Sequence, residues 1–407
     1  MYINCIILPA RLSILLGLNY KKLMRIIAEG MGVIQADHNM KRWMNMNQEF
    51  NLEEYLTNGV EWLVKDALRA TLKNPRESAF LTKYAVASKK AGGIRHKLEL
   101  EGEHIPPFLI ASITSTCNLH CKGCYARANH SCGDSEDKKH LSAMEWNRIF
   151  KESVALGIGF ILLAGGEPLI RKDVIEAAGQ YKSIIFPIFT NGTMIQSDYL
   201  AVFHQNRNLV PVISIEGGEM TTDNRRGKGI YQTIVNTMDV MKEKGILFGT
   251  SITVTKANIS EVTEKEYLDN LHSHGCKLIF YIEYVPVDKD TKNLALDSNS
   301  REYLEERINA LRESTTEMIY ISFPGDEKAS GGCLAAGRGF FHINSHGGAE
   351  PCPFSPYSDT NIRNTTLKHA LKSPLFQKLK ENYGLLSEHT GGCVLFEQQE
   401  FVESLIN

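Results

Sequence analysis

Two hydrophobic periodicities divide the chain. Between residues 51 and 91, apolar side chains recur at spacings of three and four residues, and Pro75 interrupts the run. The recurring positions include Val60, Leu63, Val64, Ala67 and Leu68. This spacing is typical of one face of an α-helix, so it predicts an α-helical N-terminal region that breaks at the proline.

From residue 107 onward the period changes, and short β-rich runs alternate with amphipathic helices. The six runs are PFLIASIT, GFILLAG, SIIFPIFTNG, NLVPVISIEG, LFGTSITVT and KLIFYIEYVP. One helix opens with a capping box of Ser142 and Glu145 and ends at Gly157, and another runs from about Ile230 to Lys244 and stops at Gly245. Repeated βα units predict an α/β fold with a parallel sheet, built as an open, partial (β/α)6 TIM-like barrel.

After the sixth unit the pattern loosens into a tail that contains Gly, Pro and Cys. We therefore expect three parts: an N-terminal helical region (1–104), a partial-barrel core (105–325) and a small Cys-containing C-terminal domain (326–407).

Unusual residues follow the first four predicted strands. They are Cys117 after the first, Gly165, Gly166, Glu167 and Pro168 after the second, Asn191 after the third, and Glu216 after the fourth. Because the carboxyl ends of parallel strands meet at one rim of such a barrel, and ligands bind there, these residues predict a site at that rim.

Composition and charge narrow the class of protein. The chain has 407 residues, 43% of them apolar, and a net charge of −2, so bulk electrostatics call for neither a nucleic-acid partner nor an anionic membrane. Nine cysteines are too sparse for a disulfide scaffold. Their clustering favours metal binding in a reducing compartment, and we expect a cytoplasmic protein.

The first residues are apolar, in the run YINCIILPARLSILLGL. Pro9 and Arg11 interrupt it well before it is long enough to span a membrane, and no basic residue precedes it as in a signal peptide. Lys21, Lys22 and Arg25 follow, so peripheral membrane contact stays an alternative. We favour a buried helix, or a translation start at a later methionine.

The stretch TCNLHCKGCYA brings Cys117, Cys121 and Cys124 within reach of one another on one loop. Three thiolates can hold three irons of a 4Fe-4S cluster, which leaves the fourth iron open to a small molecule. The alternative is zinc, with His120 or His130 as the fourth ligand of a closed tetrahedral site.

CxxxCxxC after the first strand, followed by GGEP after the second, resembles the radical S-adenosylmethionine (SAM) superfamily. The resemblance implies that the three cysteines hold a 4Fe-4S cluster whose unique iron binds SAM. It further implies reductive cleavage of SAM to a 5′-deoxyadenosyl radical, which abstracts a hydrogen atom from a substrate.

The same resemblance assigns residues to SAM. The segment from Gly165 to Pro168 would line the methionine ammonium. The stretches FTNGT and SIEGGEMTTDNRRGKGIY also match the family. They imply that Arg226 pairs with the SAM carboxylate, with Arg225 the next candidate. The expected contacts near the ribose and adenine are Asn191, Ser214, Glu216 and Tyr125. Gly123 departs from the family, which often has an aromatic residue before the third cysteine.

The tail resembles the opening of the SPASM or shortened twitch domain of one branch of this family. It carries Cys333, Cys352 and Cys393, enough for one auxiliary 4Fe-4S cluster, but lacks the usual CxxC run. The fourth iron would bind substrate or be capped by one of His342, His346, His389 and Cys132. Unrelated thiols and a zinc site are the alternatives for this tail.

The resemblance implies a radical SAM enzyme that a flavodoxin or ferredoxin reduces, acting on a peptide or protein without nucleic acid. A small molecule, a tetrapyrrole or a lipid is the alternative substrate. The N-terminal region lacks the β-rich start of a peptide-leader-binding domain, which weakens the peptide interpretation. A non-catalytic zinc- or cluster-binding protein is the alternative of another class. No acid, base or radical-quenching residue follows from the sequence.

Overall fold

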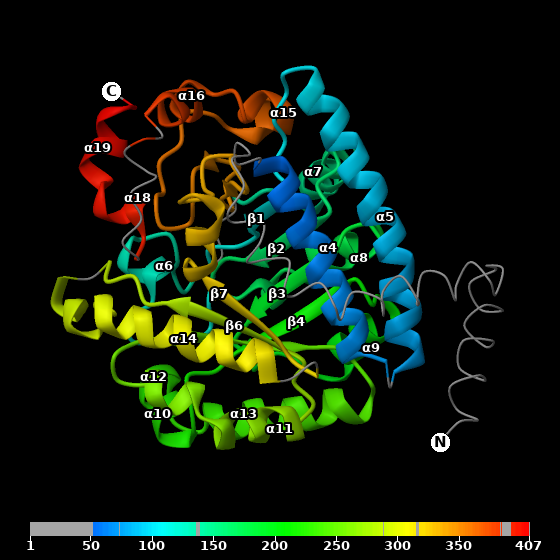
Figure 1. The fold of residues 1–407 in the computed structure, drawn as a ribbon, viewed down its shortest axis with the longest axis vertical. Coiled ribbons are helices and arrows are strands. Elements are labelled where there is room, and N and C mark those ends of the chain that lie inside the picture. The colour runs from blue at the N-terminus through cyan, green and yellow to red at the C-terminus, as the bar shows by residue number, and fades with distance from the viewer. Residues whose placement is uncertain are drawn as a thin grey trace.

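The computed structural model describes residues 52–72, 74–135, 139–287, 289–314, 317–382, 384 and 392–406. Their core is one curved sheet with the strand order β7-β6-β5-β4-β3-β2-β1-β8-β9 (Figure 1). The strands are β1 (Phe108–Ser112), β2 (Phe160–Ala164), β3 (Phe186–Thr190), β4 (Leu209–Ser214), β5 (Gly249–Val254), β6 (Leu278–Glu283), β7 (Ile319–Phe323), β8 (His342–Ile343) and β9 (Ala349–Glu350).

The six strands expected from the sequence are β1 to β6, and consecutive strands pair in parallel. The partial barrel is therefore confirmed. A seventh parallel strand, β7, pairs with β6 and was not expected. Its short run ends directly at Pro324, where the composition already resembles that of a loop.

The tail extends the core sheet. β8 pairs in parallel with β1, with Ile110 opposite His342 and Ala111 opposite Ile343, and β9 returns antiparallel to β8. β1 is therefore an interior strand, hydrogen-bonded to β2 on one side and to the tail on the other. The division at residues 325 and 326 stays a prediction.

Helices join the strands and cover the sheet, as Figure 1 shows. They are α6 (Tyr125–Ala128), α7 (Ala143–Leu156), α8 (Lys172–Gly179), α9 (Ser197–Gln205), α10 (Glu219–Arg226), α11 (Ile230–Glu243), α12 (Ile259–Thr263), α13 (Lys265–Ser273), α14 (Ser298–Ser314), α15 (Leu367–Ala370), α16 (Pro374–Glu381), α18 (Val394–Glu397) and α19 (Gln399–Ser404), with short 3-10 turns η2 (Pro168–Ile170), η3 (Lys289–Leu294), η4 (Gly325–Ser330) and η5 (Ile362–Asn364). The predicted capping box of Ser142 and Glu145 opens α7, and Gly157, at φ 78°, ends it.

The N-terminal helices α4 (Leu52–Ala70) and α5 (Pro75–Leu100) lie across the amino ends of the strands. Tyr84 Oη donates to the carbonyl of Gly159 just before β2 (2.7 Å), and Asn74 Nδ2 donates to that of Gly245 before β5 (3.0 Å). Arg95 Nη1 donates to the Gly157 carbonyl at 2.6 Å. The helical layer thus covers the end of the barrel opposite the predicted site.

Large apolar side chains fill the space between the sheet and its helices. Trp146 and Phe150 of α7 stack on each other, and Phe150 meets Phe186 of β3 edge to face. All three side chains are fully buried. None of the helices described is long and apolar enough to cross a membrane, and residues 2–18 lie outside the described part of the chain.

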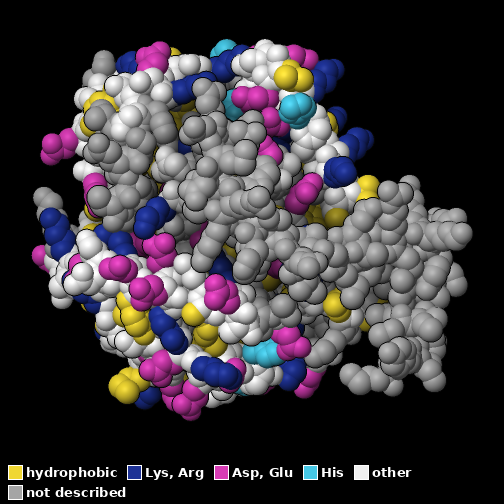
Figure 2. Space-filling view, in the orientation of Figure 1, with side chains coloured by type: hydrophobic (Ala, Val, Ile, Leu, Met, Phe, Trp, Pro, Cys, Tyr) yellow, Lys and Arg dark blue, Asp and Glu magenta, His cyan; other side chains and the backbone are white. Residues whose placement is uncertain are grey.

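Charges of both signs are interspersed on the face shown in Figure 2. This distribution agrees with the near-zero net charge.

Candidate active site

The loop that carries Cys117, Cys121 and Cys124 follows β1, and hydrogen bonds from the Arg127 side chain to its backbone carbonyls hold its shape. Arg127 lies inside the curve of the loop, and its Nη2 donates to the carbonyls of Cys117 (3.2 Å) and Leu119 (2.8 Å). All three thiols are half-buried. The loop is therefore preorganised around a fixed positive charge, which favours thiolates.

A fourth thiol lies beside this loop. Cys132 is hydrogen-bonded to Cys117, and this bond lowers the pKa of the Cys117 thiol, with Arg127 and Arg226 acting in the same sense against burial. Burial raises the pKa of Cys121, and Arg226 opposes it. Cys132, one of the caps considered for the tail cluster, thus lies at the first cysteine set.

The donor set fits an iron–sulfur cluster better than a single zinc ion. His120 Nε2 lies 3.0 Å from Asp134 Oδ1, and both side chains are largely exposed. His130 is also exposed. Within the described residues, no three His, Cys, Asp or Glu side chains converge closely enough for one metal ion. Three thiols spread along one loop suit the larger body of a cubane instead.

The GGEP motif packs its backbone directly on the strand that leads to Cys117. A Cβ on Gly165 would lie 2.2 Å from the Thr114 carbonyl oxygen, and one on Gly166 would lie 2.2 Å from that of Thr116. The backbone N–H groups of Gly166 and Glu167 donate to the same two carbonyls, at 2.9 and 2.8 Å. Only glycines let the two backbone segments come this close. The contact therefore fixes the position of the GGEP motif relative to the cysteine loop at the rim.

The side chain of Glu167 points into the protein, between the ends of β2 and β3. Its carboxylate accepts hydrogen bonds from Thr190 Oγ1 (2.7 Å), Asn191 N (2.8 Å) and Leu169 N (3.1 Å), and Pro168 follows as the first residue of η2. Burial raises the pKa of Glu167 to about 7. The expected contact with the SAM ammonium stays a prediction, and in this structure the carboxylate joins two loops of the rim.

Two more predicted residues lie at the ends of their strands with polar neighbours. Asn191 Nδ2 donates to Asn118 Oδ1 in the cysteine loop at 2.8 Å, which links β3 to that loop. Ser214 Oγ lies 3.0 Å from Ser251 Oγ of β5. These groups can donate to and accept from ribose hydroxyls, and their roles as cofactor contacts stay predictions.

Arg226 pairs with Glu216, and the SAM contacts expected of these two residues stay predictions. Its Nε and Nη2 bind the two oxygens of Glu216 at 2.5 and 2.6 Å, and its Nη1 lies 3.8 Å from Cys121 Sγ. Both side chains are buried, at 10% and 2% exposure. The guanidinium that the sequence assigns to the SAM carboxylate is thus occupied by the acid that it assigns to the ribose.

Arg225 is the better-placed cation for an incoming carboxylate. Its guanidinium lies 5.8 Å from the centre of the Tyr284 ring. Its Nε is buried without a hydrogen-bond partner among the described residues and lies 3.5 Å from Glu216 Oε1. An open groove beside the cysteine loop is lined by Arg225, Arg226 and Lys122 among others.

Tyr284, directly after β6, explains why Gly123 departs from the family pattern. A Cβ on Gly123 would lie 2.6 Å from Tyr284 Oη, and Gly123 has a positive φ of 66°. Tyr284 therefore brings an aromatic ring from another strand to the position before the third cysteine. Residue spacing along the chain gave no signal for this contact.

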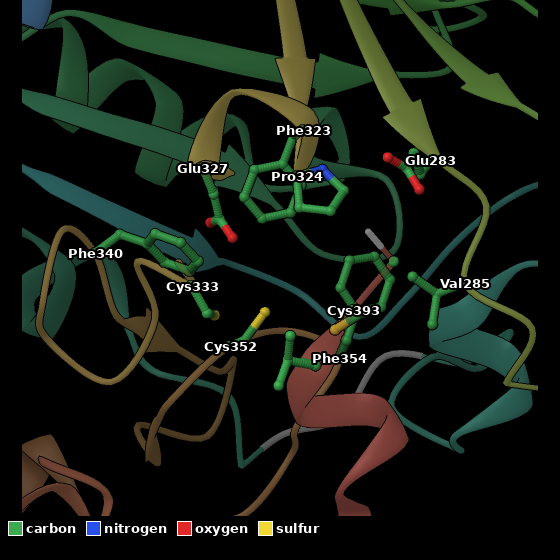
Figure 3. A pocket seen from close by; sticks show the side chains of 12 residues that line it. Glu283, Val285, Phe323, Pro324, Glu327, Cys333, Phe340, Cys352, Phe354 and Cys393 are labelled. Atoms are coloured by element: carbon green, nitrogen blue, oxygen red, sulfur yellow. The ribbon is translucent and has the colours of Figure 1, made fainter. Parts of the chain in front are cut away.

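Tyr125 faces the tail. Its ring packs on Phe354, with centroids 4.8 Å apart. Phe354 lines a small cavity together with Cys333, Cys352 and Cys393 (Figure 3). Tyr125 thus lies between the two cysteine sets, and its expected contact with adenine stays a prediction.

The cavity brings together the three tail cysteines from distant parts of the chain. The Cys352 and Cys393 thiols are hydrogen-bonded to each other, and burial raises the pKa of both Cys333 and Cys352 well above the ordinary value. The other lining residues are Glu283, Val285, Phe323, Pro324, Glu327, Phe340, Phe354, Gly392 and Val394. The convergence makes a shared cluster geometrically reasonable, although the ligand set itself stays a prediction.

The expected histidine caps do not line this cavity in the described part of the chain. His342 contacts Ser112 Oγ (2.8 Å) through Nε2 and Glu350 Oε2 (2.7 Å) through Nδ1. His346 packs on the ring of His140 instead. His389 lies outside the described residues.

Comparison with known proteins agrees with this geometry. Residues 111–266, which hold the cysteine loop and the GGEP motif, match the model of the Radical SAM superfamily. The fold and the site thus define a radical SAM domain. This part of the chain is therefore a radical SAM domain, and the cofactors of that superfamily are a 4Fe-4S cluster and SAM. Through its likeness to SkfB the chain also resembles the SPASM/twitch-containing branch.

Three relatives illustrate the range of the family. The chain is 27% identical to Fe-coproporphyrin III synthase of Methanosarcina barkeri over 54% of each protein. It is 26% identical to AdoMet-dependent heme synthase of the same organism, over 72% of this chain and 89% of that protein. It is 23% identical to the sporulation killing factor maturation protein SkfB of Bacillus subtilis, over 61% of this chain and 60% of that protein.

A solved structure shares the fold across most of the chain. SuiB of Streptococcus suis, bound to SAM, superposes with a TM-score of 0.59 at 14% identity, over 89% of this chain and 80% of that one. At this identity the likeness shows the fold alone.

Proposed function

We propose that this chain cleaves SAM reductively at a 4Fe-4S cluster held by Cys117, Cys121 and Cys124. The observation that carries the proposal is the cysteine loop itself, whose Cys117 and Leu119 carbonyls accept hydrogen bonds from Arg127 at the rim where the GGEP backbone packs. A cluster bound there would supply one electron that splits SAM into methionine and a 5′-deoxyadenosyl radical, and the radical would become 5′-deoxyadenosine by taking a hydrogen atom from the substrate.

The residues of the chain bind and orient SAM in this proposal. Arg225 receives the carboxylate, because its buried Nε lacks a partner among the described residues, whereas Arg226 is held by Glu216. Tyr284, whose ring lies against Gly123 of the cysteine loop, would contact the adenine. The ribose hydroxyls bind near Asn191 and Ser214.

We further propose one auxiliary 4Fe-4S cluster at Cys333, Cys352 and Cys393. The supporting observation is their convergence in one mostly apolar cavity (Figure 3). Reduction by a flavodoxin or ferredoxin and a location in the cytoplasm stay predictions.

The substrate that the comparisons support best is a tetrapyrrole. The match to AdoMet-dependent heme synthase extends over 89% of that protein, so it includes more than the common core. A carboxylate of such a substrate would meet Lys122 in the groove beside the cysteine loop.

A peptide or protein is the second candidate substrate and the one expected from the sequence. The match to SkfB supports it, although that match covers 60% of SkfB. The described part of the region before β1 consists of the two helices α4 and α5 without a strand, which gives this candidate less support.

The test uses anaerobically reconstituted protein with dithionite and SAM. We expect 5′-deoxyadenosine from the wild type, and none from Cys117→Ala, Cys121→Ala or Cys124→Ala. Cys276→Ala is the matched control, since this buried thiol lies away from both sets and its loss should leave the product unchanged. Wild-type yields from any loop variant would defeat the assignment.

Iron analysis separates an enzyme from a non-catalytic binding protein. We expect about eight irons and eight sulfides per chain, and about four of each in the variant lacking all three loop cysteines. Zinc without sulfide would favour the binding protein.

The substrate test adds iron coproporphyrin III, or a peptide encoded beside this protein, to the reconstituted enzyme. A tetrapyrrole substrate predicts that 5′-deoxyadenosine rises above the basal rate and that the porphyrin loses mass. A response to the peptide alone would favour the second candidate.

A further inference from the structure

The cavity of the three tail cysteines also contains two carboxylates. Figure 3 shows Glu283, at the end of β6, and Glu327, on η4, among the side chains that line it. The remaining lining residues are mostly apolar, and apolar surroundings disfavour the charged form of each carboxylate. Buried acids of this kind need a compensating partner or a metal.

Glu283 is engaged by the framework of the cavity. Its Oε2 accepts from Arg301 Nε at 2.9 Å, and its carboxylate also accepts from the backbone N–H of Gly392. Arg301 and Glu283 therefore position the residue that precedes Cys393. Glu283 thus already has two hydrogen-bond donors and stabilises the fold around Cys393.

Glu327 is oriented toward a cysteine. Only 4% of the residue is exposed, and its carboxylate accepts hydrogen bonds from the Cys333 thiol and from the backbone N–H of Leu334. In Figure 3 the side chain of Glu327 points from η4 toward Cys333. Loss of the thiol proton on cluster binding would leave this carboxylate beside the Cys333 sulfur, in the cavity that an iron would enter.

A cation lies close enough to balance the charge of such a site. Arg338 donates to the carbonyls of Gly332 (3.0 Å), Cys333 (3.3 Å) and Ser330 (2.5 Å), so it fixes the turn that joins Glu327 to Cys333. Its guanidinium thus lies against the ligand-bearing loop, where it offsets the negative charge of three thiolates and a carboxylate.

We propose that Glu327 is the fourth protein ligand of the auxiliary cluster, so that this cluster has no iron open to substrate. The proposal rests on the auxiliary cluster put forward above. Oxygen donors bind iron, and the nearby described alternatives are engaged elsewhere: His342 by Ser112 and Glu350, and Cys132 by Cys117.

The test is carried out in the full-length protein with Cys117, Cys121 and Cys124 replaced by alanine, so that every iron–sulfur signal comes from the tail. After reconstitution and iron and sulfide analysis, one equivalent of ferricyanide is added. Electron paramagnetic resonance then follows the appearance of a three-iron cluster, which forms when an iron without a protein ligand is lost.

We expect the protein with Glu327 intact to resist this loss, and Glu327→Gln to lose one iron about tenfold faster or more. Glu327→Cys should restore resistance, because a thiolate replaces the carboxylate. Glu305→Gln is the matched control, because Glu305 is an exposed acid that pairs with Lys328 of η4 at 3.1 Å and does not line the cavity, and it should behave like the protein with Glu327 intact. Equal rates with and without Glu327, or loss in Glu305→Gln as fast as in Glu327→Gln, would overturn the proposal.

A second measurement serves if Glu327→Gln does not fold. Cyanide is added to the reduced cluster with Glu327 intact; an unchanged resonance spectrum is expected, and a shifted one reveals an open iron and overturns the proposal. If the folded protein lacking the three loop cysteines takes up no iron at all, the auxiliary cluster itself fails and this inference with it. Cleavage of SAM by the wild type would still stand.

Discussion

Removal of the Arg226 guanidinium should destabilise the protein before any cofactor binds. Arg226→Ala leaves the carboxylate of Glu216, which is 2% exposed, without its bidentate partner. Breaking a buried pair in this way costs about 3–5 kcal/mol. Arg225, 3.5 Å from the same carboxylate, can compensate in part, so we expect about 3 kcal/mol.

Arg226→Lys keeps the charge but loses one of the two hydrogen bonds, so we expect a loss of about 1.5 kcal/mol. If Arg226 acted only on the SAM carboxylate, neither variant would change the cofactor-free protein. The free energy of unfolding therefore separates the two roles.

The assay is denaturant unfolding of reduced, cofactor-free protein, followed by tryptophan fluorescence and circular dichroism. Lys172→Ala is the control, because Lys172 pairs with Asp198 on the surface and its loss should leave the free energy unchanged. The double variant Arg226→Ala, Glu216→Ala should lose less than the sum of the single variants. An Arg226→Ala protein within about 1 kcal/mol of the wild type would refute the reasoning.

Three further substitutions test the framework around the site. Gly166→Ala should unfold at lower denaturant and load less iron, since its Cβ would lie 2.2 Å from the Thr116 carbonyl oxygen; normal stability and iron content would contradict the close approach. Gly59→Ala, on the exposed side of α4 with no atom within 4 Å of the new Cβ, should gain about 0.5–1 kcal/mol by the same unfolding assay. Tyr84→Phe should lower the free energy of unfolding by about 1–3 kcal/mol, because the Gly159 carbonyl loses its donor. Tyr303→Phe, at an exposed tyrosine, should leave the free energy of unfolding unchanged. Equal stability of these two tyrosine variants would show that the bond of α5 to β2 contributes little.

The elements with a strong local signal were predictable from the sequence. The capping box at Ser142 and the glycine at 157 fixed both ends of α7, and the apolar runs located six of the parallel strands. Parallel topology alone predicted that the cysteine loop, the GGEP motif and Asn191 lie at one rim, because residues after parallel strands share one edge of the sheet.

Contacts between distant segments left no such signal. β8 and β9 have two residues each, too few for a period to show, and they exist because β1 offers them a free edge. The ring of Tyr284 meets Gly123 across more than a hundred residues. Charge type alone could not tell whether Arg226 would meet a cofactor or Glu216, since both present a carboxylate.

The pairing of β8 with β1 has a consequence for how this protein can be divided. Ile110 N donates to the Phe341 carbonyl at 2.9 Å, so a chain cut before the tail would bare the backbone of β1 along one side. An uncovered strand edge is a template for adding further strands, and such a fragment would self-associate. A tail taken from another protein would therefore have to keep the register of this hairpin against β1 to cover that edge.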